Sequence, residues 1–348
     1  MSIELTRRCI ARCVMCNIWK APRDLPERTA EEWLELLASP YLAGLRELDL
    51  TGGEPFLRAD LVELLLGIGR LREQHLRRLR SVAITTNGFL TRKILDDVRA
   101  VIGPLAERGV GVVFACGMDA IGELHDRIRG YSDGWTQLNA TIEGLMSVRE
   151  THPSLVLGLK TTITPHNVDE LDRVAHYAEQ RSLFTIISPC ILTAARYDNI
   201  EHREALEFST ADREKIRRFY QGPHFRWSYY RDELIRFLEE GRMRKPCSAA
   251  FNYYFIRSTG ELFACPIIPS PLGNVTETPI EGLARSSRAR RFRRGVGHFS
   301  ECRTCTEPGL ERYALPFEGF HYLRLRFEKG REQFVALHQH LGLDKYFP

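Results

Sequence analysis

Features that would place a protein in a membrane or on a polyanion are missing from this sequence. No apolar run approaches the roughly 18–20 residues that a membrane-spanning helix needs. A secretory signal is missing too, because Glu4, Arg7, Arg8 and Arg12 interrupt any apolar segment at the start. There is also no strong excess of one charge, since 49 Lys and Arg stand against 45 Asp and Glu, a net charge of +4. We therefore expect a cytoplasmic protein with no membrane span and no nucleic-acid partner.

The cysteine content does not suit a disulfide-stapled secreted module. The chain has nine cysteines in 348 residues, an odd number, whereas such modules are short and pair their cysteines. Most of the cysteines fall into two groups, one at the N-terminus and one in the last third of the chain. Cys116 and Cys190 stand apart and are expected to be small apolar fillers. With 43% hydrophobic and 27% charged residues, the composition is that of a globular protein with a sizeable core.

Residues 2–190 alternate short apolar runs with longer amphipathic segments, which predicts an α/β fold. Strands are expected at 3–6, 45–50, 81–86, 110–115, 155–162 and 183–187, and helices near Thr29 and at 60–72, 91–107, 134–150 and 168–181. Thr29 and Glu32 form a capping-box pattern at the first helix. Six β-α alternations imply a parallel sheet, and hence a partial (β/α)6 barrel whose chemistry lies in the loops at the carboxyl ends of the strands.

Composition divides the chain into four parts. We expect the barrel over 1–190, a helical bridge over 191–244, a small cysteine-rich domain over 245–308 and a C-terminal tail over 309–348. Helices are expected at 210–220 and 230–241 in the bridge and at 330–341 in the tail. The arginine-rich run 288–294 is interpreted as the solvent-exposed face of a helix, because the low net charge argues against nucleic acid.

The first cysteine group is Cys9, Cys13 and Cys16, with the spacing C-x3-C-x2-C, directly after the first expected strand. Three thiolates this close together can hold three irons of a [4Fe–4S] cluster. The fourth iron then has no protein ligand and can bind a substrate or a cofactor. The alternative is a zinc site, which would need a fourth ligand, and the first histidine in the chain is His75. The spacing therefore favours iron–sulfur over zinc.

This cysteine pattern after the first strand of a β-α barrel resembles the radical S-adenosylmethionine (radical SAM) superfamily. Further segments are similar to the motifs of that family in the same order along the chain: Thr51-Gly52-Gly53-Glu54-Pro55, Thr85-Thr86-Asn87-Gly88, Cys116-Gly117-Met118-Asp119, His125-Asp126-Arg127-Ile128-Arg129-Gly130 and residues 160–167. Each segment alone is a common turn or strand end. The ordered set, with one motif at each successive strand end, is specific.

The resemblance implies which residues bind SAM. It predicts that Glu54 takes the methionine amino group, and that contacts to SAM come from Met15, Gly52, Gly53, Glu54, Pro55, Thr86, Asn87, Gly117 and Lys160. Asp119 and Lys160 are the candidates to reach the reacting groups. The chain departs from the family pattern at Ile10, at Met15 and at Gly117, where relatives often have serine. The last departure removes a hydroxyl contact to SAM.

The resemblance also implies a mechanism. The open iron chelates the amino and carboxylate groups of SAM, and one electron from the reduced cluster cleaves the S–C5′ bond. The products are methionine and a 5′-deoxyadenosyl radical, which abstracts a hydrogen atom from the substrate. The protein places the reactants and excludes water.

The second cysteine group consists of Cys247, Cys265, Cys302 and Cys305. It resembles the C-terminal domains called SPASM, which carry two clusters, and their shortened one-cluster form called twitch. Four cysteines imply one auxiliary [4Fe–4S] cluster with full protein ligation, whose role is electron transfer. The alternative is a zinc ribbon, because four thiolates suit zinc equally well.

These observations predict a radical SAM oxidoreductase whose substrate is a small sugar-like or lipid-linked metabolite. That preference follows because the chain starts on the first strand and shows no leader-binding domain of the kind that peptide maturases often carry. A peptide processed with a separate leader-binding partner is the first alternative, and a non-enzymatic iron–sulfur or zinc protein on a decayed barrel is the second. The electron donor is expected to be a flavodoxin- or ferredoxin-type protein.

Overall fold

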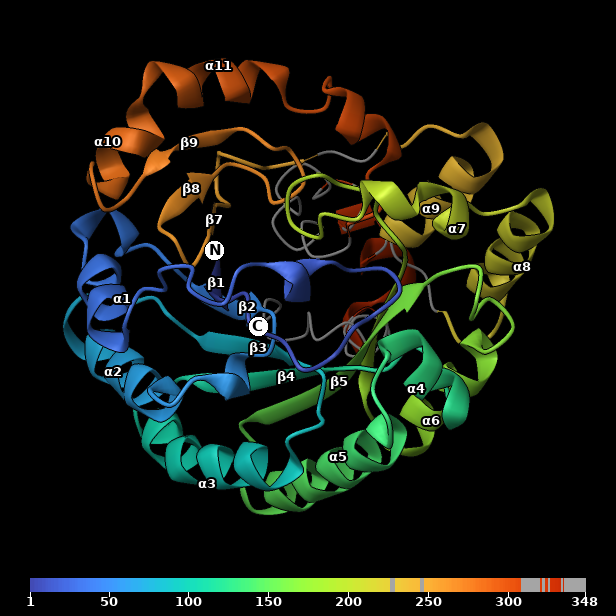
Figure 1. The fold of residues 1–348 in the computed structure, drawn as a ribbon, viewed down its shortest axis with the longest axis horizontal. Coiled ribbons are helices and arrows are strands. Elements are labelled where there is room, and N and C mark those ends of the chain that lie inside the picture. Colours follow the sequence, from blue (N-terminus) through green and yellow to red (C-terminus); the bar gives the residue numbers. More distant parts are fainter. Residues whose placement is uncertain are drawn as a thin grey trace.

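A computed structural model describes residues 1–225, 229–244 and 247–307, together with a few residues between 320 and 334. The described strands form one sheet of nine, in the order β6-β5-β4-β3-β2-β1-β7-β8-β9. Figure 1 shows the sheet curling at the centre of the molecule with helices around it. Most of the expected helix at 330–341 and most of the tail lie outside the described residues.

The six barrel strands are β1 (Ser2–Thr6), β2 (Glu47–Gly52), β3 (Ser81–Thr86), β4 (Gly111–Gly117), β5 (Leu155–Ile163) and β6 (Phe184–Pro189). Each neighbouring pair is parallel. The expected strands and the partial barrel are therefore confirmed, with boundaries shifted by a few residues at most. Because all six strands run the same way, the loops that follow them meet at one end of the barrel.

The helices that cover the barrel are α1 (Ala30–Leu37), α2 (Leu61–Gln74), α3 (Thr91–Glu107), α4 (Glu123–Arg129), α5 (Gly134–Thr151) and α6 (Leu171–Gln180). The capping box at α1 is confirmed, since the Thr29 hydroxyl accepts a hydrogen bond from the Glu32 amide and the Glu32 carboxylate accepts one from the Thr29 amide. Helix α4 was not expected. It is short, and it is bounded by Gly122 and Gly130, both of which have positive φ.

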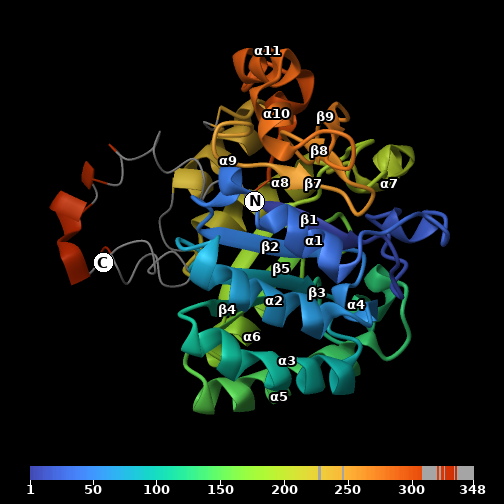
Figure 2. The same ribbon diagram turned by 90° about the vertical axis from the view of Figure 1, so that its left-hand side faces the viewer.

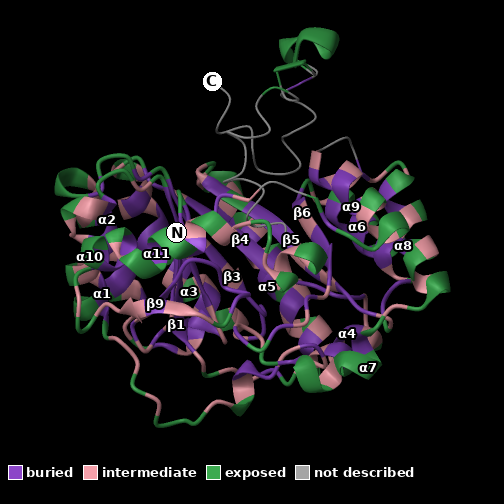
Figure 3. Ribbon diagram, turned by 90° about the horizontal axis from the view of Figure 1, so that it is seen from above, coloured by how far each residue is buried: buried purple, intermediate pink, exposed green. Residues whose placement is uncertain are grey.

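The main core lies between the sheet and this helical layer. Trp33 of α1 is fully buried there, in the same core cluster as apolar side chains of β1 and β2. Figure 3 shows buried strands under helices that have one buried and one exposed face. A second core cluster forms under the bridge, whose helices are α7 (Arg203–Leu206), α8 (Thr210–Gln221) and α9 (Tyr229–Glu240). The two longer bridge helices match the expected ranges within one residue.

The C-terminal cysteine-rich segment is not separate from the barrel. It contains β7 (Phe255–Ile256), β8 (Glu261–Phe263), β9 (Pro271–Asn274), α10 (Ile280–Arg285) and α11 (Ser287–Gly295). Strand β7 pairs in parallel with β1, through Ser2 with Phe255 and Ile3 with Ile256, so the sheet continues from one part into the other. Figure 2 shows this segment stacked directly on β1. Among the described helices, none is long and apolar enough to cross a membrane.

Candidate active site

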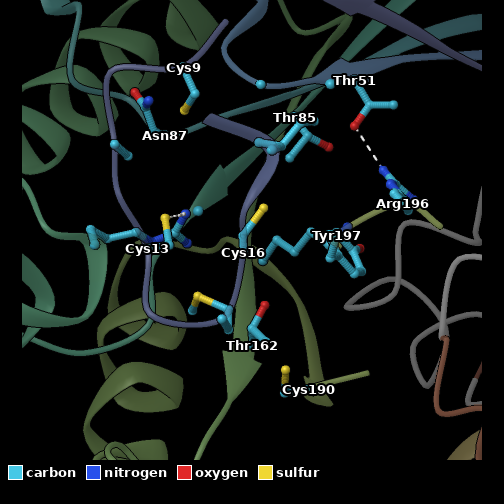
Figure 4. Close-up of a pocket in the computed structure, with 18 of the residues that line it drawn as sticks. Cys9, Cys13, Cys16, Thr51, Thr85, Asn87, Thr162, Cys190, Arg196 and Tyr197 are labelled. Carbon is cyan, nitrogen blue, oxygen red and sulfur yellow. Dashed lines mark hydrogen bonds between the residues drawn. The ribbon is translucent and has the colours of Figure 1, made fainter. Parts of the chain in front are cut away.

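The first three cysteines lie on the loop after β1, at the end of the barrel where the strand ends meet. Backbone hydrogen bonds hold this loop against distant segments: Arg12 N donates to Arg129 O at 2.9 Å, Val14 N to Ile128 O at 2.9 Å, and Asn17 N to Tyr197 O at 2.9 Å. The loop therefore encloses a cavity of about 150 Å³, and Cys9, Cys13 and Cys16 all line it. Figure 4 shows the three sulfurs arranged around this space.

Burial raises the pKa of Cys9 to about 12 and that of Cys16 to about 11, and the Cys13 thiol adds to both shifts. A buried thiol is costly to ionise unless a cation compensates the charge. The Arg129 guanidinium lies 4.0 Å from Cys13 Sγ, as a hydrogen-bond donor to that sulfur. Three thiols on one cavity beside a fixed cation fit a cluster that requires thiolates.

Gly52 and Gly53 allow the turn after β2 to press against the cysteine loop. A Cβ at Gly52 would lie 2.2 Å from Thr6 O, and one at Gly53 would lie 2.1 Å from Arg8 O. Gly52 also has φ +129°, a conformation that side chains rarely adopt. The amides of Gly53 and Glu54 donate to Thr6 O and Arg8 O at 2.8 and 2.9 Å. Glycine is therefore needed here for a close backbone approach to the loop that carries the cysteines.

Glu54 lies behind the cavity wall. Its side chain is fully buried and accepts hydrogen bonds from Thr86 Oγ1, from Asn87 N at 2.8 Å and from Phe56 N at 3.1 Å. Burial raises the pKa of Glu54 to about 7, although the hydrogen bonds from these donors oppose the shift. The carboxylate therefore fixes the loops after β2 and β3 to one another. Its expected contact with the amino group of SAM stays a prediction.

Gly117, at the end of β4, lies under the guanidinium of Arg129. A Cβ at this position would lie 2.6 Å from Arg129 Nη2. Arg129 is held there by Asp119, whose Oδ2 is 2.6 Å from Arg129 Nε, and the Asp119 side chain is fully buried. Asp119 also accepts a hydrogen bond from Thr162 N at 2.8 Å. The place of a serine side chain is therefore taken by a guanidinium, and Asp119 acts on the cavity through Arg129.

The bridge and the end of the cysteine-rich segment contribute cavity residues that no sequence motif indicated. Arg196 lines the cavity, and its guanidinium donates a hydrogen bond to Thr51 Oγ1 at 2.8 Å, from the side opposite the cysteine loop (Figure 4). Tyr197 and Glu307 lie on the same wall. Burial raises the pKa of the Tyr197 hydroxyl well above its usual range. No spacing rule joins residues 196 and 307 to a loop at residue 9, so only the fold could identify them.

The structure thus brings most of the predicted SAM residues onto one wall. The cavity is lined by Cys9, Cys13, Cys16, Met15, Gly52, Gly53, Thr86, Asn87, Gly117 and Lys160. Glu54, Pro55 and Asp119 are not among the lining residues. Five lining residues, Thr51, Thr85, Lys160, Arg196 and Glu307, also line a smaller space of about 70 Å³ inside the barrel. These five residues therefore lie between the cysteine cavity and the barrel interior, and they line both spaces.

The second cysteine group lines a cavity of about 430 Å³ in the C-terminal segment. All four cysteines lie on its wall, with Cys265 buried and the other three half-buried. Backbone amides of Ala249 and Ile267 donate to the sulfurs of Cys247 and Cys265 at 3.4 and 3.5 Å. Such donors stabilise thiolates.

Among the described residues, no three Cys, His, Asp or Glu side chains converge on a single metal ion. A zinc ribbon needs four sulfurs about 2.3 Å from one point. In a cubane cluster, each cysteine holds a different iron, so the sulfurs remain spread around the cavity. Four cysteines on one cavity have the ligand set of either centre, a cubane cluster or zinc.

Comparison with known proteins agrees with this site. The model of the radical SAM superfamily matches residues 3–178, and that of the iron–sulfur cluster-binding SPASM domain matches residues 247–306. The chain is 28% identical to a PqqA peptide cyclase from Streptomyces rochei, over 88% of this chain and 81% of the relative. It is 25% identical to an AdoMet-dependent heme synthase from Methanosarcina barkeri, over 80% of each.

More distant similarities point the same way. The sporulation killing factor maturation protein SkfB of Bacillus subtilis is 21% identical over 91% of this chain and 71% of that protein. The solved structure of native anSMEcpe with bound AdoMet superposes with a TM-score of 0.58 at 17% identity, covering 84% of this chain and 81% of the other. At this identity, the structural likeness shows a shared fold.

Proposed function

The chain belongs to the radical SAM superfamily, and on that premise we propose that it abstracts a hydrogen atom from a small polar substrate held in the barrel interior. It is an enzyme, with a SAM-binding [4Fe–4S] cluster in the barrel and an auxiliary cluster in the SPASM domain. The alternative of a non-enzymatic protein on a decayed barrel is therefore set aside. The observation that carries the proposal is the pair of neighbouring cavities, one at the three cysteines and one inside the barrel, which share five lining residues.

The two cysteine groups and the other cavity residues have different roles in this proposal. Cys9, Cys13 and Cys16 would hold the first cluster, and Cys247, Cys265, Cys302 and Cys305 the second. When bound, the first cluster and SAM supply the 5′-deoxyadenosyl radical. The protein side chains bind SAM, orient the substrate beside it and exclude water from the cavity.

Arg129 is the residue that we assign to the carboxylate of SAM. It lines the cavity, it is 4.0 Å from Cys13 Sγ, and Asp119 fixes its orientation. A guanidinium can donate two parallel hydrogen bonds to a carboxylate, which a serine hydroxyl cannot do. In this proposal, the glycine at position 117 removes a hydroxyl contact to SAM but leaves space for the Arg129 guanidinium, which binds the carboxylate more strongly.

The barrel interior supports a small polar substrate. Both cavities are lined by two threonines, two cationic residues and one acidic residue: Thr51, Thr85, Lys160, Arg196 and Glu307. Such mixed donors and acceptors suit a molecule with several hydroxyl groups, such as a sugar. The inner space is only about 70 Å³, which suits one small ring or side chain.

A peptide substrate is the second candidate, and the relatives favour it. Two of them are named as a peptide cyclase and as a maturation protein for a sporulation killing factor. A peptide would place one side chain in the inner space and leave its backbone outside. A leader-binding partner protein would then hold the rest of the peptide.

We propose a reducing compartment, the cytoplasm, as the place of action, and a flavodoxin- or ferredoxin-type donor as the source of electrons. All nine cysteines are free thiols. Free cysteines at this density are typical of proteins that remain in reducing surroundings.

The test uses anaerobically reconstituted protein. Iron and sulfide are quantified, dithionite and SAM are added, and 5′-deoxyadenosine is measured by chromatography. About eight irons per chain, as two cubane clusters require, with slow formation of 5′-deoxyadenosine is the expected result. A triple variant of Cys9, Cys13 and Cys16 to alanine should retain about four irons and form no 5′-deoxyadenosine.

Substrate class is read from deuterium transfer. Deuterated sugars and a deuterated cell-extract peptide fraction are incubated separately with the enzyme, and deuterium in 5′-deoxyadenosine is measured. Transfer from the peptide fraction alone would refute the small-molecule proposal. A fully loaded protein that forms no 5′-deoxyadenosine with either fraction would refute the hydrogen-abstraction proposal itself.

A further inference from the structure

Helix α11 presents an arginine-rich outer face. Arg288, Arg290, Arg291 and Arg294 are exposed, whereas Ala289 and Phe292 of the same helix are buried. Arg285 pairs with Glu281 at 3.1 Å, but no carboxylate in the described part of the chain lies within ion-pair distance of Arg288, Arg291 or Arg294. This outer face is called the α11 arginine face below.

The positive charge of the whole protein is concentrated here. Residues 285–303 contain seven arginines and one glutamate, a net charge of +6, which exceeds the +4 of the entire chain. The remainder of the protein is therefore net negative, at −2. Uneven charge of this kind steers a partner of opposite sign to one face.

Helix α11 contributes Phe292 to the wall of the four-cysteine cavity, whereas Arg288, Arg291 and Arg294 are not among the lining residues. Phe292 and residues 296–299, which follow the helix, form one wall of that cavity, and Arg242 and Arg244 form another part of it. Arg303, between Cys302 and Cys305 in the sequence, is exposed. Arg242 and Arg244 therefore place positive charge at the cavity whose wall includes Phe292 of the arginine-rich helix.

The helix is also fixed firmly enough to serve as a rigid surface. Arg293 points inward, and its guanidinium donates to Ala250 O at 2.7 Å, Ala284 O at 2.7 Å and Tyr254 Oη at 2.8 Å. The Phe292 and Phe299 rings pack with their centroids 4.9 Å apart. Arg293 thus has a structural role, and Arg290 donates a hydrogen bond to Arg285 O at 2.8 Å, whereas Arg288, Arg291 and Arg294 make no hydrogen bond or ion pair within the described part of the chain.

We propose that the α11 arginine face docks an acidic one-electron carrier protein of the flavodoxin or ferredoxin class, over the four-cysteine cavity. The inference rests on the proposed function, because it supplies the electron donor that the proposed function requires. Complementary charge gives the encounter its speed and orientation, and the half-buried cysteines lie where a docked carrier would bring its redox group.

The test measures binding of a purified flavodoxin to the full-length reconstituted enzyme. The variant R288E/R291E/R294E should weaken binding at low salt by about ten-fold or more, and R288Q/R291Q/R294Q should have an intermediate effect. Raising the salt concentration should weaken binding to the unaltered enzyme and change that of the charge-reversed variant little. Flavodoxin-driven formation of 5′-deoxyadenosine should fall in parallel, while dithionite-driven formation stays unchanged.

The matched control is R70E/R77E/R78E, which makes the same change in charge at three exposed arginines before β3. Equal loss of flavodoxin binding in both variants, or no loss in either, overturns the proposal. Tighter binding of an RNA oligonucleotide or of anionic vesicles than of flavodoxin, lost in the α11 variant, overturns it in favour of those partners. If dithionite drives no SAM cleavage, the proposed function fails, whereas the binding comparison still decides the docking surface.

Discussion

Replacing Gly117 by serine, the residue that relatives often carry there, is expected to weaken SAM binding in this protein. The new Cβ would lie 2.6 Å from Arg129 Nη2 and 3.0 Å from Arg129 Cζ, so the guanidinium would have to move. Arg129 cannot swing aside freely, because Asp119 holds it at 2.6 Å and its side chain is only 14% exposed. The substitution therefore sets a new side chain against a fixed ion pair.

Two costs follow. Overpacking at a buried site destabilises a protein by about 1–3 kcal/mol. A displaced guanidinium would also lose its charge-assisted hydrogen bonds to the carboxylate of SAM, worth about 1.5–3 kcal/mol. That second cost corresponds to a rise in the Kd for SAM of about 10- to 150-fold.

The assay is equilibrium binding of SAM to the anaerobically reconstituted variant, with a urea unfolding curve for stability. Gly44→Ser is the control, since a Cβ at Gly44 meets no atom within 4 Å. In an Arg129→Ala background, Gly117→Ser should cost little, because its partner is gone. Unchanged or tighter SAM binding in the single variant at unchanged stability would refute the role given to Arg129.

Three further outcomes are expected. Asp119→Asn should lower the free energy of unfolding by about 3–5 kcal/mol, measured in urea, because it leaves the Arg129 charge buried without its partner, and a value below about 1 kcal/mol would contradict this. Glu54→Gln should flatten the pH dependence of the free energy of unfolding. Burial raises the Glu54 pKa to about 7, so the folded chain binds more protons than the unfolded chain between about pH 4.5 and 7. The unaltered protein therefore loses up to about 1.4 kcal/mol of stability per pH unit as the pH rises through that window. Cys302→Ala should lower the iron content from about eight to about four per chain while dithionite-driven SAM cleavage persists. Loss of SAM cleavage together with the iron would show that the two centres are not independent.

The sheet of the barrel could be predicted from the sequence because each strand has a recognisable local sequence pattern. Runs such as 81–86 are short and β-branched, and they alternate with amphipathic helices of ordinary length. The helix at α1 could be placed because its capping box lies within four consecutive residues. Helix α4 was missed because seven residues between two glycines carry too little periodicity to be recognised.

The residues of the site also fall into those that a local sequence pattern indicated and those that only the fold identified. Both cysteine groups were found because metal ligands close in sequence leave a spacing pattern. Arg129 and Arg196 were not assigned to the cavity, because their roles depend on the hydrogen bonds that join the cysteine loop to residues 128–129 and 197. Glu54 shows the converse, since its motif was recognised and the fold then buried its carboxylate beneath the wall.

The sequence by itself determined the chemistry: seven cysteines at ligand spacing, the two glycines that let the cysteine loop close, and six β-α units that bring the motifs to one end of a barrel. Only the tertiary structure decided how these parts join. The pairing of β1 with β7 unites residues 2 and 255 in one sheet, and Arg129 fills the space left by Gly117. Such contacts arise from packing between segments far apart in the chain, so local sequence patterns do not predict them.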